Sequence, residues 1–192
     1  MYGIVVSALL VFMTGGVAAS EPADPLVIAK GNVVTVDGTI RAEEWKEAKA
    51  VKVGGNEYLF QTDGEFLCIA VRGVKQAILT VAIESEKGVR VLHASASLGE
   101  AGYEKRDGGY ARTSGFEWTC SDNSKAAEDA RAKEREEHLA TKGWVGATIG
   151  RGEHQPEMKI RLSELKGAAS KDGAAITVNV FSAMAMGKDK GK

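Results

Sequence analysis

Hydrophobic and polar residues alternate along most of the chain after residue 26, and this period of two is typical of half-buried β-strands. The runs that show it span residues 26–30, 32–36, 51–54, 57–62, 66–73, 77–85, 88–95, 109–120, 144–150, 157–162 and 174–183. Turn residues separate these runs, and Asp-Gly pairs begin at residues 37, 63, 107 and 172. The pattern therefore predicts an all-β domain over residues 26–186, folded as an antiparallel β-sandwich.

The run at 66–73 differs from the others because it has no polar face. From residue 66 to residue 71 the odd-numbered and the even-numbered positions are both apolar. A strand of this kind is typical of a central position with cover on both sides. We therefore expect this run to lie in the middle of its sheet.

Two segments have a helical pattern instead. Residues 124–141 are rich in alanine, glutamate, lysine and arginine, and Gly143 follows as a stop signal. This segment predicts one long charged helix inserted between the strands, with little apolar surface to bury. Residues 42–48 predict one or two helical turns with Trp45 and Ala48 on the same face, and we expect Trp45 to be buried there.

The first 20 residues have the composition of a secretory signal peptide. Residues 4–13 are apolar and uncharged, small residues follow, and Val17 and Ala19 fit the pattern that precedes a cleavage site. The apolar run is shorter than the ~20 residues that a membrane span needs. We expect an exported protein, secreted or periplasmic, with no stable membrane span after cleavage, and a disordered tail at residues 187–192.

Composition and motifs exclude several functions. The net charge of −1 gives no electrostatic basis for binding nucleic acid. The sequence contains no G-x-S-x-G, no H-E-x-x-H and no phosphate-binding glycine loop, so we expect no enzyme activity. Cys68 and Cys120 are either one disulfide or two separate thiols, and the sequence leaves both alternatives open.

Three motifs, in order along the chain, resemble the family-nine carbohydrate-binding modules and their DOMON-like relatives. They are VDGTIRAEEWKEAKAV at residues 36–51, NEYLFQTDGEFLCIAVRG at residues 56–73 and GEHQPEMKIRLSELKG at residues 152–167. The resemblance implies a β-sandwich whose first motif is a structural start signal around Trp45. The chain departs from the family pattern at Gln61 and Thr62, where members that stack sugars carry an aromatic residue. It also departs at Cys68, in place of a tyrosine, and at Arg161, in place of a proline.

The resemblance implies a saccharide or another small extracellular ligand, bound without catalysis. Aromatic and polar residues near the end of the strand series are the candidates for such a site: Trp118, Tyr110, Trp144, Arg112 and Glu117. The alternation also allows Phe116 and Trp118 to be core residues, and it favours that interpretation.

Two other functions remain as alternatives. DOMON-like relatives bind haem b between a methionine and a histidine or lysine, which makes His93 and Met158 the haem candidates. The alternation places His93 with Val89 and Val91 on the apolar side of its strand, where a core histidine is expected. The other alternative is an interaction domain of the cell envelope without a ligand. We expect no bound cofactor and no metal.

Overall fold

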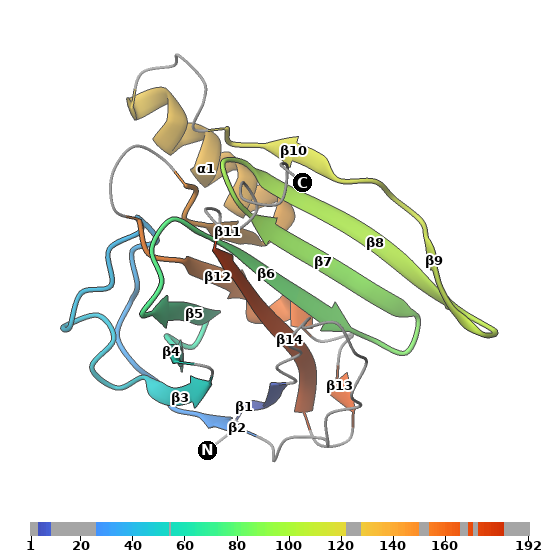
Figure 1. Ribbon diagram of the computed structural model, residues 1–192, viewed down its shortest axis with the longest axis horizontal. Coiled ribbons are helices and arrows are strands. Elements are labelled where there is room, and N and C mark those ends of the chain that lie inside the picture. Colours follow the sequence, from blue (N-terminus) through green and yellow to red (C-terminus); the bar gives the residue numbers. More distant parts are fainter. Residues whose placement is uncertain are drawn as a thin grey trace, which may run out of the picture.

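The computed structural model describes residues 4–8, 26–53, 55–121, 128–149, 154–165, 169–170 and 173–182. In these residues two sheets form, and one α-helix lies beside them (Figure 1). The strands are β1 (Ile4–Ala8), β2 (Leu26–Ile28), β3 (Lys49–Val53), β4 (Asn56–Thr62), β5 (Phe66–Arg72), β6 (Ala77–Glu84), β7 (Gly88–Ala94), β8 (Leu98–Arg106), β9 (Gly109–Arg112), β10 (Glu117–Thr119), β11 (Trp144–Gly146), β12 (Glu157–Arg161), β13 (Ala169–Ser170) and β14 (Gly173–Ser182). The helices are α1 (Glu128–Lys142) and the short 3₁₀ helix η1 (Leu162–Leu165).

We call the sheets the large sheet and the small sheet. The large sheet has the order β10-β8-β7-β6-β14-β1-β2, with β9 beside β8 and β13 beside β14. The small sheet has the order β11-β12-β5-β4-β3. Neighbouring strands of the described residues pair antiparallel, with the exception of β1 and β14, which are parallel. The predicted mainly antiparallel β architecture with one helix is confirmed at this level.

β5 lies in the middle of the small sheet and is covered on both faces, as predicted. Leu67, Ile69 and Val71 belong to the main core cluster, which contains residues of both sheets. The alternate positions of β5 belong to a second cluster, which also contains Trp45 and Val34. The absence of a polar face in the sequence of β5 therefore follows from its burial on both sides.

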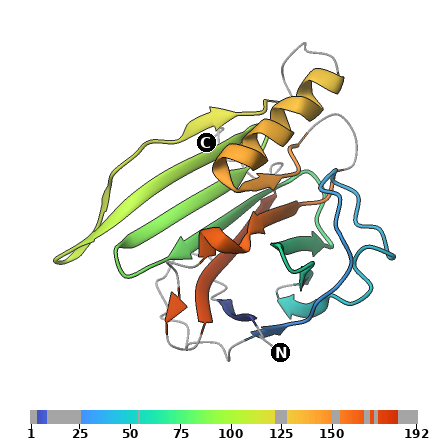
Figure 2. The ribbon, with the colours of Figure 1, turned by 180° about the vertical axis from the view of Figure 1, so that it is seen from behind.

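The main core cluster joins the two sheets. β6 contributes Leu79, Val81 and Ile83, while β7 contributes Leu92 and Ala94. Because successive side chains of a strand point to opposite faces, the residues between these positions lie on the other face of the large sheet. We call that face the outer face. Figure 2 shows the opposite side of the molecule, where α1, β12 and η1 lie in front of the large sheet.

A buried carboxylate fixes the segment that enters the domain. Trp45 is 3% exposed, and its Nε1 donates a hydrogen bond to Glu157 Oε1 at 3.2 Å. The backbone amide of Gly38 donates to the other oxygen, Oε2, at 2.8 Å. Glu157 lies on β12, so two of the motifs that carry the family resemblance meet at this one carboxylate.

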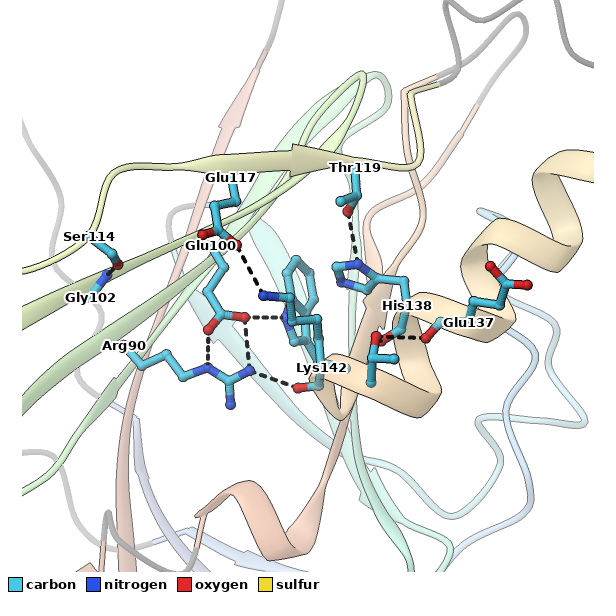
Figure 3. Close-up of polar contacts among 11 residues, drawn as sticks. Arg90, Glu100, Gly102, Ser114, Glu117, Thr119, Glu137, His138 and Lys142 are labelled. Atoms are coloured by element: carbon cyan, nitrogen blue, oxygen red, sulfur yellow. Dashed lines mark hydrogen bonds and ion pairs between the residues drawn. The ribbon is translucent and has the colours of Figure 1, made fainter.

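A second carboxylate fixes the end of α1 to the large sheet (Figure 3). Arg90 on β7 donates to both oxygens of Glu100 on β8, at 2.8 and 2.9 Å. The same guanidinium donates to the carbonyl of Lys142, the last residue of α1, at 2.7 Å. Glu100 Oε2 also accepts a hydrogen bond from Trp144 Nε1 at 3.0 Å. One bidentate ion pair therefore connects β7, β8, the helix end and β11.

Residues 32–36 were predicted as a strand, and this is wrong, because they pair with no strand; Val34 is buried and Val33 is 73% exposed. The one or two helical turns predicted at residues 42–48 are confirmed only in part: the Trp45 amide donates to the Arg41 carbonyl at 3.2 Å, which closes a single turn, and no longer helix forms. β8 was not predicted, because Gly99, Gly102 and the charged residues at its end conceal its alternation.

The sequence also led to predictions for the two ends of the chain and for the two cysteines. The backbone of β1, inside the predicted signal peptide, pairs with β14 and β2. Signal cleavage stays a prediction, and the tail at 187–192 lies outside the described residues. Cys68 and Cys120 are buried thiols that are not joined in a disulfide, and burial raises the pKa of Cys68 to about 12. Among the described helices none has the length and apolar character to cross a bilayer.

Candidate functional site

The outer face of the large sheet carries a row of four residues on four neighbouring strands. Thr80 on β6 lies opposite His93 on β7, and His93 lies opposite Gly99 on β8. Gly99 in turn lies opposite Trp118 on β10. Residues directly opposite one another in an antiparallel sheet share a face, so this row runs across the outer face toward the β10 edge.

Aromatic rings gather at the β10 end of this row. The Trp118 and Phe116 ring centroids are 5.2 Å apart, and the two rings are inclined by only 23°. The imidazole of His93 lies edge-on to both, with centroid distances of 5.5 Å to Trp118 and 5.6 Å to Phe116. We call His93, Phe116 and Trp118 the aromatic cluster. Trp118 is 54% exposed, so the cluster presents a large indole surface to solvent.

Gly99 makes room for this indole. A Cβ at position 99 would lie 2.7 Å from both Cε3 and Cζ3 of Trp118, and 3.1 Å from Cδ1 of Phe116. Any larger residue would push the rings away from the sheet. The position of the indole therefore depends on a residue on the neighbouring strand.

Replacing Gly99 with alanine is expected to displace Trp118, since the added methyl group occupies the place of its six-membered ring. The expected result is a change in near-ultraviolet circular dichroism and a red shift of tryptophan fluorescence, with the far-ultraviolet spectrum unchanged. The same substitution in a Trp118→Ala background is the control and should leave the remaining fluorescence unaltered. An equal change in both backgrounds would show that position 99 acts on another tryptophan.

Two further predicted site residues, Arg112 and Tyr110, lie on the same face, on β9. Arg112 is opposite Tyr103, and its guanidinium carbon lies 5.9 Å from the centroid of Phe116. Tyr110 is 49% exposed, and its hydroxyl donates to Glu84 Oε1 at 2.8 Å. This hydrogen bond raises the pKa of Tyr110. Arg112 is therefore next to the aromatic cluster, and Tyr110 lies further along the strand.

The structure separates the other two predicted residues from the exposed indole. Trp144 is fully buried in the main core cluster, so its prediction as part of an exposed platform is wrong. Its indole ring packs edge-on against His138, with centroids 4.9 Å apart. Glu117 alternates with Trp118 along β10 and forms an ion pair with Lys142 at 3.1 Å, on the helix side. The interpretation of Trp118 as a core residue is also wrong, because its side chain is more than half exposed.

His93 lies on the outer face and not on the core side, contrary to the prediction from its parity. Leu92 and Ala94 occupy the core positions of β7, and His93 Nδ1 lies 3.0 Å from the hydroxyl of Thr80. Desolvation lowers the pKa of His93, so the imidazole is neutral at pH 7. The parity argument failed because Val89 and Val91 are themselves on the outer face, where apolar residues flank the aromatic cluster.

His93 and Met158, the haem candidates, are not placed to bind one haem together. Met158 is fully buried in the main core cluster between the sheets, while His93 lies on the outer face of the large sheet. The large sheet itself separates the two side chains, so they cannot be the two axial ligands of one haem. Among the described residues no group of three histidine, cysteine or acidic side chains is arranged to hold a metal ion.

A groove of about 510 Å³ lies elsewhere, beside the turn between β6 and β7. Its lining includes Arg90, Tyr103, Glu104 and Glu164. Arg90 is already bound by Glu100, by Glu164 at 2.8 Å and by the carbonyl of Lys142. The groove consequently offers a ligand no free guanidinium, and the aromatic cluster is the better candidate site.

Comparison with known proteins assigns no ligand to the aromatic cluster. No protein-family model, curated protein or solved structure matches the chain.

Proposed function

We propose that this protein is an exported, non-catalytic β-sandwich domain that binds a saccharide on the outer face of its large sheet. The observation that carries the proposal is the exposed indole of Trp118, aligned with Phe116 above Gly99. A flat, solvent-exposed aromatic surface is suited to the apolar face of a sugar ring. The hydroxyl groups at the ring's edge then need polar partners, and Arg112 supplies one beside the cluster, while Tyr110 lies further along β9, in reach of a neighbouring sugar of a chain.

The Trp118 indole is also ordered by its neighbours before a ligand binds, and this favours binding. His93 supports the ring from the sheet side, and Gly99 allows it to lie close to β8. An aromatic side chain that is already ordered loses little conformational freedom when a ligand binds. The aromatic cluster is therefore preorganised as a binding surface.

The resemblance to family-nine carbohydrate-binding modules supports the same function. Trp45 and Glu157, which belong to the first and third motifs, share a hydrogen bond in the core. Gln61 and Thr62 are buried and offer no stacking surface beside the β4–β5 hairpin. We infer that the sugar surface has moved from that hairpin to the β10 edge.

The test is binding of the full chain to a glycan array, followed by calorimetry on the glycans that bind. Trp118→Ala is expected to lower the affinity at least about tenfold, the size of effect seen when a central tryptophan anchor is removed. Val33→Ala is the control. It shortens another exposed apolar side chain, in the segment 32–36 outside the strands of the large sheet, and should leave glycan binding unchanged. Unchanged binding by Trp118→Ala would refute the site. Absence of any glycan binding would favour the envelope interaction domain.

A further inference from the structure

We propose, on the basis of the proposed function, that the saccharide is acidic: a chain that contains hexuronate residues, with a carboxylate bound by Arg112 while a sugar ring stacks on Trp118. The inference rests on the position of Arg112, on its unused hydrogen-bond donors and on the charges of the surrounding strands.

Arg112 lies close to the exposed indole of Trp118. The guanidinium carbon of Arg112 lies 5.9 Å from the centroid of Phe116, and Phe116 is the ring that lies beside Trp118. Cation and indole are therefore separated by one aromatic ring on the same face of the sheet. A ligand that covers the indole extends toward the guanidinium, either with the same sugar or with the next sugar of the chain.

Arg112 also retains hydrogen-bond donors that the protein does not use. Arg112 Nε donates to the carbonyl of Ser114 at 3.0 Å, which fixes the direction of the side chain. Within the described residues, Nη1 and Nη2 of Arg112 have no acceptor. A guanidinium offers its donors in a planar arrangement that matches the two oxygens of a carboxylate. Arg112 is thus oriented by the protein and retains the two nitrogens that a carboxylate requires.

The charges of strands β6 to β10 also favour an anionic ligand. The carboxylates on strands β6 to β10 each already accept a hydrogen bond from a side chain: Glu84 from Tyr110, Glu100 from Arg90, Glu104 from Arg106 and Glu117 from Lys142. Glu86 and Asp107 lie in the hairpin turns and not on these strands. Among the described residues, Arg112 and Lys105 are the cations of these strands without a carboxylate partner. On the outer face itself these strands place two cations, Lys105 and Arg112, and one carboxylate, Glu84. The net positive charge of the outer face therefore favours an anion.

A uronate meets both requirements of this surface. It keeps the hexose ring, whose axial C–H groups form the face that stacks on an indole, and it carries a carboxylate at C6. A neutral hexose would use the indole and leave the Arg112 donors to water. We therefore expect the negative charge to add affinity to a stacking interaction that both kinds of sugar share.

The experiment compares acidic oligosaccharides with their methyl esters, which keep the ring and remove the charge. Hexamers of galacturonate, glucuronate and mannuronate, each in both forms, are titrated into the purified full chain by calorimetry. At least one acidic form is expected to bind about tenfold more tightly than its ester, as an added charge-assisted bidentate pair implies. The difference should shrink at high salt because the site is exposed.

Two variants connect this preference to the residue. Arg112→Gln is expected to reduce the affinity for the acidic form to that of the ester, with an unchanged melting temperature. Lys52→Gln removes one exposed positive charge from β3 of the small sheet and should keep the full preference. Equal loss in both variants would indicate a general charge effect and overturn the role of Arg112.

The outcomes separate this inference from the function on which it rests. Equal binding of acid and ester, lost in both cases with Trp118→Ala, would overturn the acidic ligand and leave saccharide binding intact. If Arg112→Gln still prefers the acidic form over the ester, Arg112 is not the residue that binds the ligand's carboxylate, and that part of the proposal is overturned. Failure of every acidic, esterified and neutral glycan to bind would overturn both proposals.

Discussion

Replacing Trp144 with alanine is expected to lower the free energy of unfolding by about 4 kcal/mol. The indole is fully buried in the core between the two sheets, so its removal leaves a large cavity. The substitution also removes the hydrogen bond that Trp144 Nε1 donates to Glu100. Urea denaturation, followed by far-ultraviolet circular dichroism, measures the loss.

Trp118→Ala is the matched control for this prediction, because it removes the same side chain from an exposed position. Its expected cost is below about 1 kcal/mol, since a truncated surface side chain leaves no cavity. The two tryptophans therefore have opposite expected profiles: Trp144 affects stability, and Trp118 affects binding. Similar losses of stability in the two variants would mean that the burial assigned to them is incorrect.

Glu157 is expected to make the protein less stable as the pH rises from about 4.5 to about 7. Burial raises the pKa of Glu157 from its usual 4.5 to about 7. The folded state therefore binds this proton more tightly than the unfolded chain does. The stabilising contribution is complete below the unfolded-state pKa and is lost as the pH rises through the folded-state pKa. Two or more pKa units of difference correspond to about 3 kcal/mol across this range.

The measurement is the difference in unfolding free energy between the wild type and Glu157→Gln, taken by urea denaturation at several pH values. The amide of the substituted side chain has no carboxyl proton to titrate, so this part of the pH dependence should disappear. His93 and His138 have lowered pKa values from desolvation and change stability in the opposite direction, but both are present in both proteins. Parallel curves for the two proteins would show that Glu157 does not titrate in this range.

The sequence predicted those strands whose pattern of apolar and polar residues matches their burial in the fold. β5 was recognisable because both of its faces are apolar, and burial on both sides is what the structure shows. β8 was missed because its glycines leave space for side chains of neighbouring strands, so its own alternation carries little information. Pairing with β7 and β10 makes this segment a strand, and such pairing is not visible in one segment of sequence.

The candidate site was predictable as a set of residue types and not as an arrangement. Trp118 and Arg112, two of the predicted site residues, lie together on the outer face, whereas Trp144 was predicted with them and lies in the core. Nothing in a single strand reveals which of its two faces is buried when both contain apolar residues. Gly99 decides the placement of Trp118, and it could be found only by knowing that β8 lies between β7 and β10.

The most direct measurement of saccharide binding by Trp118 uses the indole N–H signals of the three tryptophans in ¹⁵N-labelled protein. The Nε1 atoms of Trp45 and Trp144 are hydrogen-bonded to Glu157 and Glu100 in the core, while Trp118 is exposed. Trp118→Ala identifies its signal. On titration with a glycan that binds, we expect a progressive shift of the Trp118 signal, with the signals of Trp45 and Trp144 unchanged. A bound glycan that leaves the Trp118 signal in place would contradict saccharide binding by Trp118.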